Sequence, residues 1–222
     1  MENQLSEKES LDLIGQMIST AKNNLQKGMG YIFLLWGYMV AGISLAIFIL
    51  LEFLPYETRY TAFYLWFLMI FGYPLHIWIL KRMDRERLVM TYVEKLMKWV
   101  WIAFSLSILF VVVGLLVATI HIVMAYPEIE PKFEYIRWFH WLFMTPFMLC
   151  LYGFALFVSG KAYAFKPLVA GGIFCWAATL VLLFSLHFSQ ILMVQQVVLC
   201  LSAIAGFIIP GHLLNRKERF HV

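Results

Sequence analysis

The sequence predicts an all-α integral membrane protein: a bundle of six transmembrane helices, preceded by an amphipathic helix, with both termini in the cytoplasm. Composition is the first reason, because 63% of the 222 residues are hydrophobic and 14% are charged. Soluble domains are about 45–50% apolar and about 25% charged. The second reason is the length of the uncharged runs, and the third is the uneven distribution of Lys and Arg between them.

Six uncharged runs are each long enough for a crossing, which takes about 20 helical residues. They lie near 28–51, 60–80, 99–126, 138–160, 167–187 and 190–215, and together they form a single membrane domain, 28–215. The last two runs belong to one uncharged stretch, 167–215, which is far too long for one crossing. We therefore expect a turn at the polar residues 187–190.

Residues 1–27 are polar and carry an apolar stripe at helical spacing, which predicts an amphipathic helix. The stripe comprises Leu11, Ile14, Ile18 and Leu25. Such a helix packs on the cytoplasmic side of its own bundle, lies on the lipid surface or docks a partner.

The loops give the orientation. If both termini and the loops near 81–98 and 161–166 share one side, that side holds fourteen Lys and Arg residues and the other side holds three. The positive-inside rule then places both termini, including the basic tail 216–222, in the cytoplasm of a cell or inner membrane. The same rule accounts for the net charge of +4, so this charge does not indicate that the protein binds nucleic acid.

The sequence does not indicate an enzyme. It contains no zinc, phosphate-loop or nucleophile-elbow motif, and its Asp and Glu residues lie outside the interiors of the predicted spans. The leading hypothesis is a non-enzymatic membrane subunit, scaffold or sensor. Its partners would be the lipid bilayer and a membrane or cytoplasmic protein that contacts residues 1–27 and 81–98, including Arg82, Arg85 and Arg87. The protein could also form a homo-oligomer on this hypothesis.

A small permease or channel for a neutral or amphipathic solute is the alternative. Pro74, Pro146 and Pro210 each fall in an even-numbered span, where proline kinks a helix. A polar cavity or ligand site would use Gln195 and Gln196 together with two histidines of a repeated Pro-x-His sequence, His76 and His212.

The histidines permit a third hypothesis, a b-type haem redox protein. His76 and His212 fall near the cytoplasmic ends of their spans, and His121, His140 and His187 fall near the opposite ends. Two layers of imidazole are the pattern that paired haems or a metal would need. Interfacial histidines explain the same pattern, and no cofactor is expected.

Overall fold

The computed structural model describes residues 28–85, 92–127, 139–186 and 190–219, and every regular element in these ranges is a helix. The prediction of an all-helical fold is therefore confirmed for this part of the chain. In order, the elements are α2 (Met29–Phe53), η1 (Tyr56–Phe71), α3 (Gly72–Arg85), α4 (Tyr92–Ala125), η3 (Phe139–Phe143), α6 (Met144–Ala162), α7 (Lys166–Phe184), α8 (Ile191–Ala203), η4 (Ile204–Ile208) and α9 (Ile209–Arg219). Both η1 and η3 are 3₁₀-helices, and η4 is a π-helix.

Six helical stretches within the described ranges are long and apolar enough to cross a membrane. They are Met29–Phe53, Thr61–Arg82, Lys95–Ala125, Phe139–Ala162, Lys166–Phe184 and Ile191–Lys217. Three of them are composite, because η1 continues into α3, η3 into α6, and α8 into η4 and α9. By length and composition, the chain is therefore a multi-pass membrane protein.

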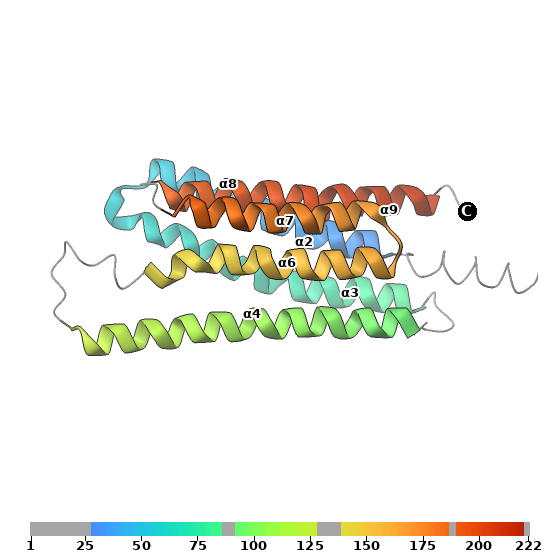
Figure 1. Ribbon diagram of the computed structural model, residues 1–222, viewed down its shortest axis with the longest axis horizontal. Coiled ribbons are helices and arrows are strands. Elements are labelled where there is room, and N and C mark those ends of the chain that lie inside the picture. The colour runs from blue at the N-terminus through green and yellow to red at the C-terminus, as the bar shows by residue number, and fades with distance from the viewer. Residues whose placement is uncertain (1–27, 86–91, 128–138, 187–189, 220–222) are drawn as a thin grey trace, which may run out of the picture.

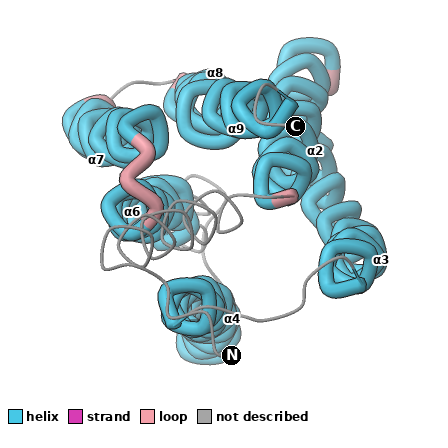
Figure 2. Tube along the Cα trace, turned by 90° about the vertical axis from the view of Figure 1, so that its right-hand side faces the viewer, coloured by secondary structure: helices cyan, strands magenta, loops and turns pink. Residues whose placement is uncertain are grey.

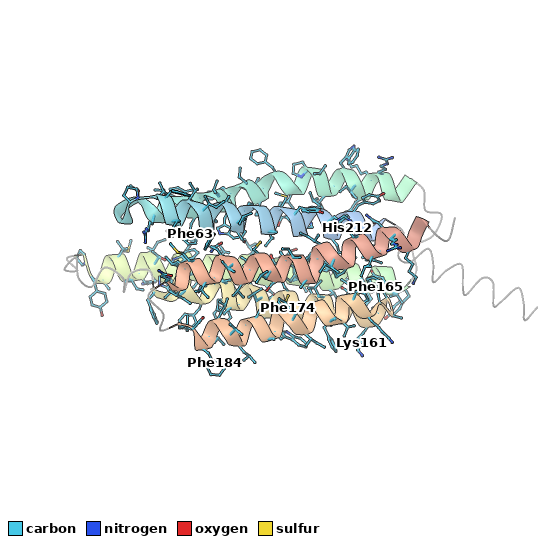
Figure 3. All side chains as sticks on the ribbon, turned by 90° about the horizontal axis from the view of Figure 1, so that it is seen from above. Phe63, Lys161, Phe165, Phe174, Phe184 and His212 are labelled. Atoms are coloured by element: carbon cyan, nitrogen blue, oxygen red, sulfur yellow. The ribbon has the colours of Figure 1, made fainter. Side chains whose placement is uncertain are left out.

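The six stretches run side by side and alternate in direction (Figure 1). One end of the bundle, on the right of Figure 1, holds the start of α2, the end of α3, the start of α4, the connection from α6 to α7 and the end of α9. We call it the basic end, because the sequence places these cations there: Lys81, Arg82, Lys95, Lys98, Lys161, Lys166, Arg216 and Lys217. His212 lies in the same half of the bundle as Lys161, and Phe63 and Phe184 lie in the opposite half (Figure 3).

The core lies among α2, α6, α7 and the α8–η4–α9 span. Its main apolar cluster includes Phe33, Leu149, Leu156, Leu168 and Phe207, each at most 4% exposed. A third or more of the most apolar stretch is buried in each of these four spans, against 6% in Thr61–Arg82 and none in Lys95–Ala125. The second and third spans are therefore peripheral.

The end-on view shows this division (Figure 2): α3 lies outside α2, and α4 lies outside α6. Near the basic end, α4 reaches the core through the buried Met97 and through two aromatic rings, Trp101 and Phe104. Trp101 packs edge-on against Phe33, and Phe104 stacks on Tyr152. Beyond them, α4 presents a long series of exposed Leu, Val, Ile and Phe side chains.

Glycines let the central helices approach closely. A methyl group added to Gly172 of α7 would lie 2.8 Å from both the carbonyl oxygen of Gly153 and the backbone nitrogen of Phe157 on α6. One added to Gly37 of α2 would lie 2.8 Å from Phe207. Small residues at helix contacts are typical of membrane bundles, because there packing rather than water exclusion holds the helices together.

The three even-span prolines share one structural position. Pro74 and Pro146 are the third residues of α3 and α6, and Pro210 is the second residue of α9. Each therefore starts an α-helix that follows a 3₁₀ or π segment. The missing N–H of proline costs least in a first helical turn, so the change of helix type accommodates all three.

The 16 residues of η1 have the periodicity of three that a 3₁₀-helix requires. Phe63, Trp66 and Met69 pack toward the core, whereas Tyr64 and Phe67 are exposed, and the Tyr64 and Phe67 rings stack at 6.2 Å. No local signal in the sequence predicts this 3₁₀ segment.

Several predictions fall on residues outside the described ranges. These include the N-terminal helix with Leu11, Ile14, Ile18 and Leu25, and also Arg87 and His187. They stay predictions.

Candidate functional site

The two Pro-x-His sequences place their histidines against the same helix. In α3, His76 is half-buried, and its Nδ1 atom accepts a hydrogen bond of 3.0 Å from the indole N–H of Trp36 on α2. In α9, His212 is exposed, and its Nε2 atom lies 2.7 Å from the hydroxyl of Tyr38, also on α2. Because Trp36 and Tyr38 are two residues apart, they point to nearly opposite sides of the helix. The structure therefore brings the two histidines to the same level of the bundle, on opposite flanks of α2.

The contact on the α3 side is the more enclosed of the two. The Trp36 ring packs edge-on against Tyr73 at 5.3 Å and lies 5.8 Å from the His76 ring. Gly72 lies directly over Trp36, since an added methyl group would be 3.1 Å from the indole ring. Three residues of α3 therefore meet one indole.

The two glutamines of α8 have different environments, although they are adjacent. Gln195, 2% exposed, donates from Nε2 to the carbonyl oxygen of Leu142 at 2.6 Å, and its Oε1 lies 3.4 Å from the Thr145 hydroxyl. Leu142 is four residues before Pro146, which has no N–H to donate to that carbonyl. Gln195 therefore supplies the hydrogen bond that Pro146 cannot make.

Gln196 is 1% exposed, and its Oε1 atom has no hydrogen-bond partner among the described residues. The same holds for the hydroxyl of Ser44 on α2, which is 0% exposed. Both residues lie on helices that pack together, at levels between the main cluster and a second one around Ile47 and Leu51. A buried polar atom without a partner costs about 1–3 kcal/mol, so each of these two atoms destabilises the described fold unless a further group bonds to it.

His140 belongs to a separate network, at the end of the bundle opposite the basic end. The indole N–H of Trp141 donates to the Thr119 hydroxyl at 2.9 Å, and that hydroxyl donates to the Leu115 carbonyl at 2.8 Å. The Nε2 atom of His140 lies 2.8 Å from the Thr119 oxygen and 3.1 Å from the Leu115 carbonyl oxygen. This geometry assigns the His140 proton to Nε2, and the network fastens η3 to α4.

His121 is exposed on α4. Among the described residues, no three His, Cys, Asp or Glu side chains are grouped as a metal ion would require. His76 and His140 are instead used in contacts between helices.

The predicted basic interaction face is described in part. Arg82 is exposed, and its guanidinium lies 5.8 Å above the Trp78 ring, a cation–π contact within α3. Arg85 ends α3, and its side chain is outside the described part. Lys161 makes a similar contact with Phe157, at 5.5 Å.

Sequence reasoning missed the aromatic partners. A Trp near the end of a span, such as Trp36, is by sequence typical of an interfacial anchor. No local signal linked it to His76, which is 40 residues away, nor linked Gln195 to Leu142, which is 53 residues away.

No protein-family model matches the chain. No curated protein and no solved structure is significantly similar to it either.

Proposed function

We propose that this protein is a non-enzymatic membrane subunit that assembles with a second membrane protein through α4 and the span formed by η1 and α3. The uneven burial of the six spans carries the proposal. Four spans bury a third or more of their most apolar stretch, and Lys95–Ala125 buries none of it. A helix that adds so little to its own bundle is available for lateral contact with another protein.

The contacts of α4 fit this role. Beyond Trp101 and Phe104, the described polar attachment of α4 is the network around Thr119 at the far end, and the side chains between these points are at most partly buried. Between these points, the outward face of α4 is apolar, and Phe110 is 74% exposed. Lipid also covers such a face, so the experiment has to separate lipid from protein.

Site-directed photocrosslinking makes this separation. A photoreactive phenylalanine replaces Phe110 on α4 or, as the matched control, Phe154 on α6, which is 54% exposed. We expect a discrete protein adduct from position 110 and lipid adducts alone from position 154. Equal adduct patterns at the two positions would contradict the proposal. Co-expression of two differently tagged copies then shows whether the partner is a second copy.

The proposed orientation places the basic end, both termini and the expected helix at 1–27 in the cytoplasm. The excess of Lys and Arg in the loops at that end supports this arrangement. The cytoplasmic face, with Arg82, Arg85 and Arg87, would then be a second contact surface for a soluble partner. Reporter fusions at residues 128–138 and at the C-terminus test the orientation, and activity of a cytoplasmic reporter at 128–138 would contradict it.

A small permease is the second candidate, and the unpartnered oxygens of Gln196 and Ser44 favour it. Both are acceptors buried between apolar clusters, as a site for a small neutral solute with hydrogen-bond donors would be. Uptake in proteoliposomes tests this candidate: Gln196→Leu should abolish uptake that Gln195→Leu only weakens. The bonds of Gln195 argue for a structural role at that position.

A haem-binding redox protein is the third candidate. It rests on the sequence pattern of histidines, and the absorption spectrum of the purified protein decides it.

A further inference from the structure

We infer that His76 is a proton-sensitive contact: neutral, it holds α3 on α2, and protonated, it releases α3. This inference concerns how the second span is held and does not depend on the proposed function.

The chemistry of the hydrogen bond requires a neutral imidazole. The Trp36 indole nitrogen is a donor only, so the Nδ1 atom of His76, 3.0 Å away, has to be the acceptor. The proton of neutral His76 is therefore on Nε2. Protonation adds a hydrogen to Nδ1, which then faces the indole N–H. Two donors cannot bond to each other, and the contact is lost.

Attachment of α3 is concentrated at this point. Gly72, Tyr73 and His76 all meet Trp36. The rest of the described α3 surface is mostly exposed, including Leu75, Ile77, Trp78 and Leu80. Loss of the bond to Trp36 therefore removes the one described polar contact between α3 and α2.

Among the side chains that the structure describes on α3 and on the helices packed against it, no carboxylate lies at the level of His76 to hold an imidazolium in place. The elements packed on α3 are α2 and η1. The charged residues of α2 and η1 are Glu52, Glu57 and Arg59, all at the end of the bundle opposite the basic end. On α3, the charged groups toward the basic end with described side chains are Lys81 and Arg82, both exposed, and Tyr73 is the titratable group beside Trp36. The facing indole donor therefore opposes the protonated form in the attached state.

The second histidine is a built-in comparison. A tyrosine hydroxyl is both donor and acceptor, so the 2.7 Å contact of Tyr38 with His212 survives protonation, because the hydroxyl oxygen can accept from a protonated Nε2. The two Pro-x-His sequences therefore have similar positions but different responses to protons, because one histidine faces an indole and the other a phenol.

The direct test follows the Trp36 indole proton by NMR in the full-length protein, labelled with 15N-tryptophan and reconstituted in nanodiscs. The Trp36→Phe variant assigns the resonance. Between about pH 8 and about pH 5, the range in which histidines titrate, we expect a shift upfield and at least a tenfold loss of protection of this proton, measured as its exchange rate relative to that of a solvent-exposed indole at the same pH. His212→Gln should leave that transition unchanged. A Trp36 resonance that does not change over this range overturns the inference.

A distance measurement tests the release of α3. Spin labels at Tyr31 on α2 and Leu80 on α3, both exposed, report their separation by pulsed EPR in a background where the native cysteines are replaced. We expect a longer and broader distance distribution at low pH. His76→Gln keeps an acceptor for Trp36 and does not titrate, so its distribution should not depend on pH. Retention of the full pH response in His76→Gln overturns the inference.

Discussion

The adjacent glutamines of α8 should respond in opposite ways to the same substitution. Gln195→Leu removes the 2.6 Å donor to the Leu142 carbonyl and leaves that carbonyl without the bond that Pro146 cannot supply. Interhelical hydrogen bonds in membranes are worth about 0.6 kcal/mol on average and at most about 1.7 kcal/mol, and a buried orphan acceptor adds to the loss. We expect a loss of about 1–2 kcal/mol in the free energy of unfolding.

Gln196→Leu should not lower the free energy of unfolding. The Gln196 oxygen is buried without a partner, so an apolar side chain of similar size removes a desolvated polar atom and breaks no described bond. We expect between no change and a gain of about 1 kcal/mol in stability. The matched pair is measured by reversible unfolding in mixed micelles, with helicity as the readout.

A third substitution identifies the bond responsible. Pro146→Ala supplies a backbone N–H four residues after Leu142, so the carbonyl no longer depends on Gln195. The loss caused by Gln195→Leu should then shrink in the Pro146→Ala background, as a double-mutant cycle measures. Equal losses from the two glutamine variants, or no coupling to Pro146, would refute this reasoning. The first outcome would also show that Gln196 has a bound partner.

Two further predictions concern the packing of α7 on α6 and the hydrogen-bond network around Thr119. Gly172→Ala should lower the free energy of unfolding by about 1–3 kcal/mol, because its methyl group would lie 2.8 Å from the α6 backbone. Gly114→Ala on α4, where a methyl group has open space, should leave that free energy unchanged. Comparable losses for the two variants in thermal unfolding would contradict the packing argument. Thr119→Val leaves the Trp141 donor without its acceptor and should cost about 1–2 kcal/mol. Thr61→Val breaks only a local bond, so an equal cost would contradict this account.

The pattern of residues in the sequence was enough for the class of fold. The charge of a segment and the length of its apolar run are properties of that segment alone. The six spans can therefore be predicted from the sequence without knowing which spans pack together. The start of α4 at Tyr92, ahead of the run expected at 99–126, also has a local cause. Its amphipathic first turns continue into the apolar run without a helix-breaking residue.

Within the candidate site, the sequence indicated the polar residues but not their roles. Gln195 and Gln196 carry the same side chain in the same apolar run, and they differ only in what faces them. The three prolines looked like kinks of α-helices, and the structure places each at a change of helix type instead.

The sequence by itself determined that this protein lies in a membrane with about six crossings and a strongly basic set of loops. Only the tertiary structure decided that α2 is central and α4 peripheral, and that His76 meets Trp36 while His212 meets Tyr38. The physical reason is that lipid tails are as apolar as the protein core. A span apolar on every face gives no periodicity that distinguishes core from lipid, and polar partners 40 to 174 residues apart are set by packing alone.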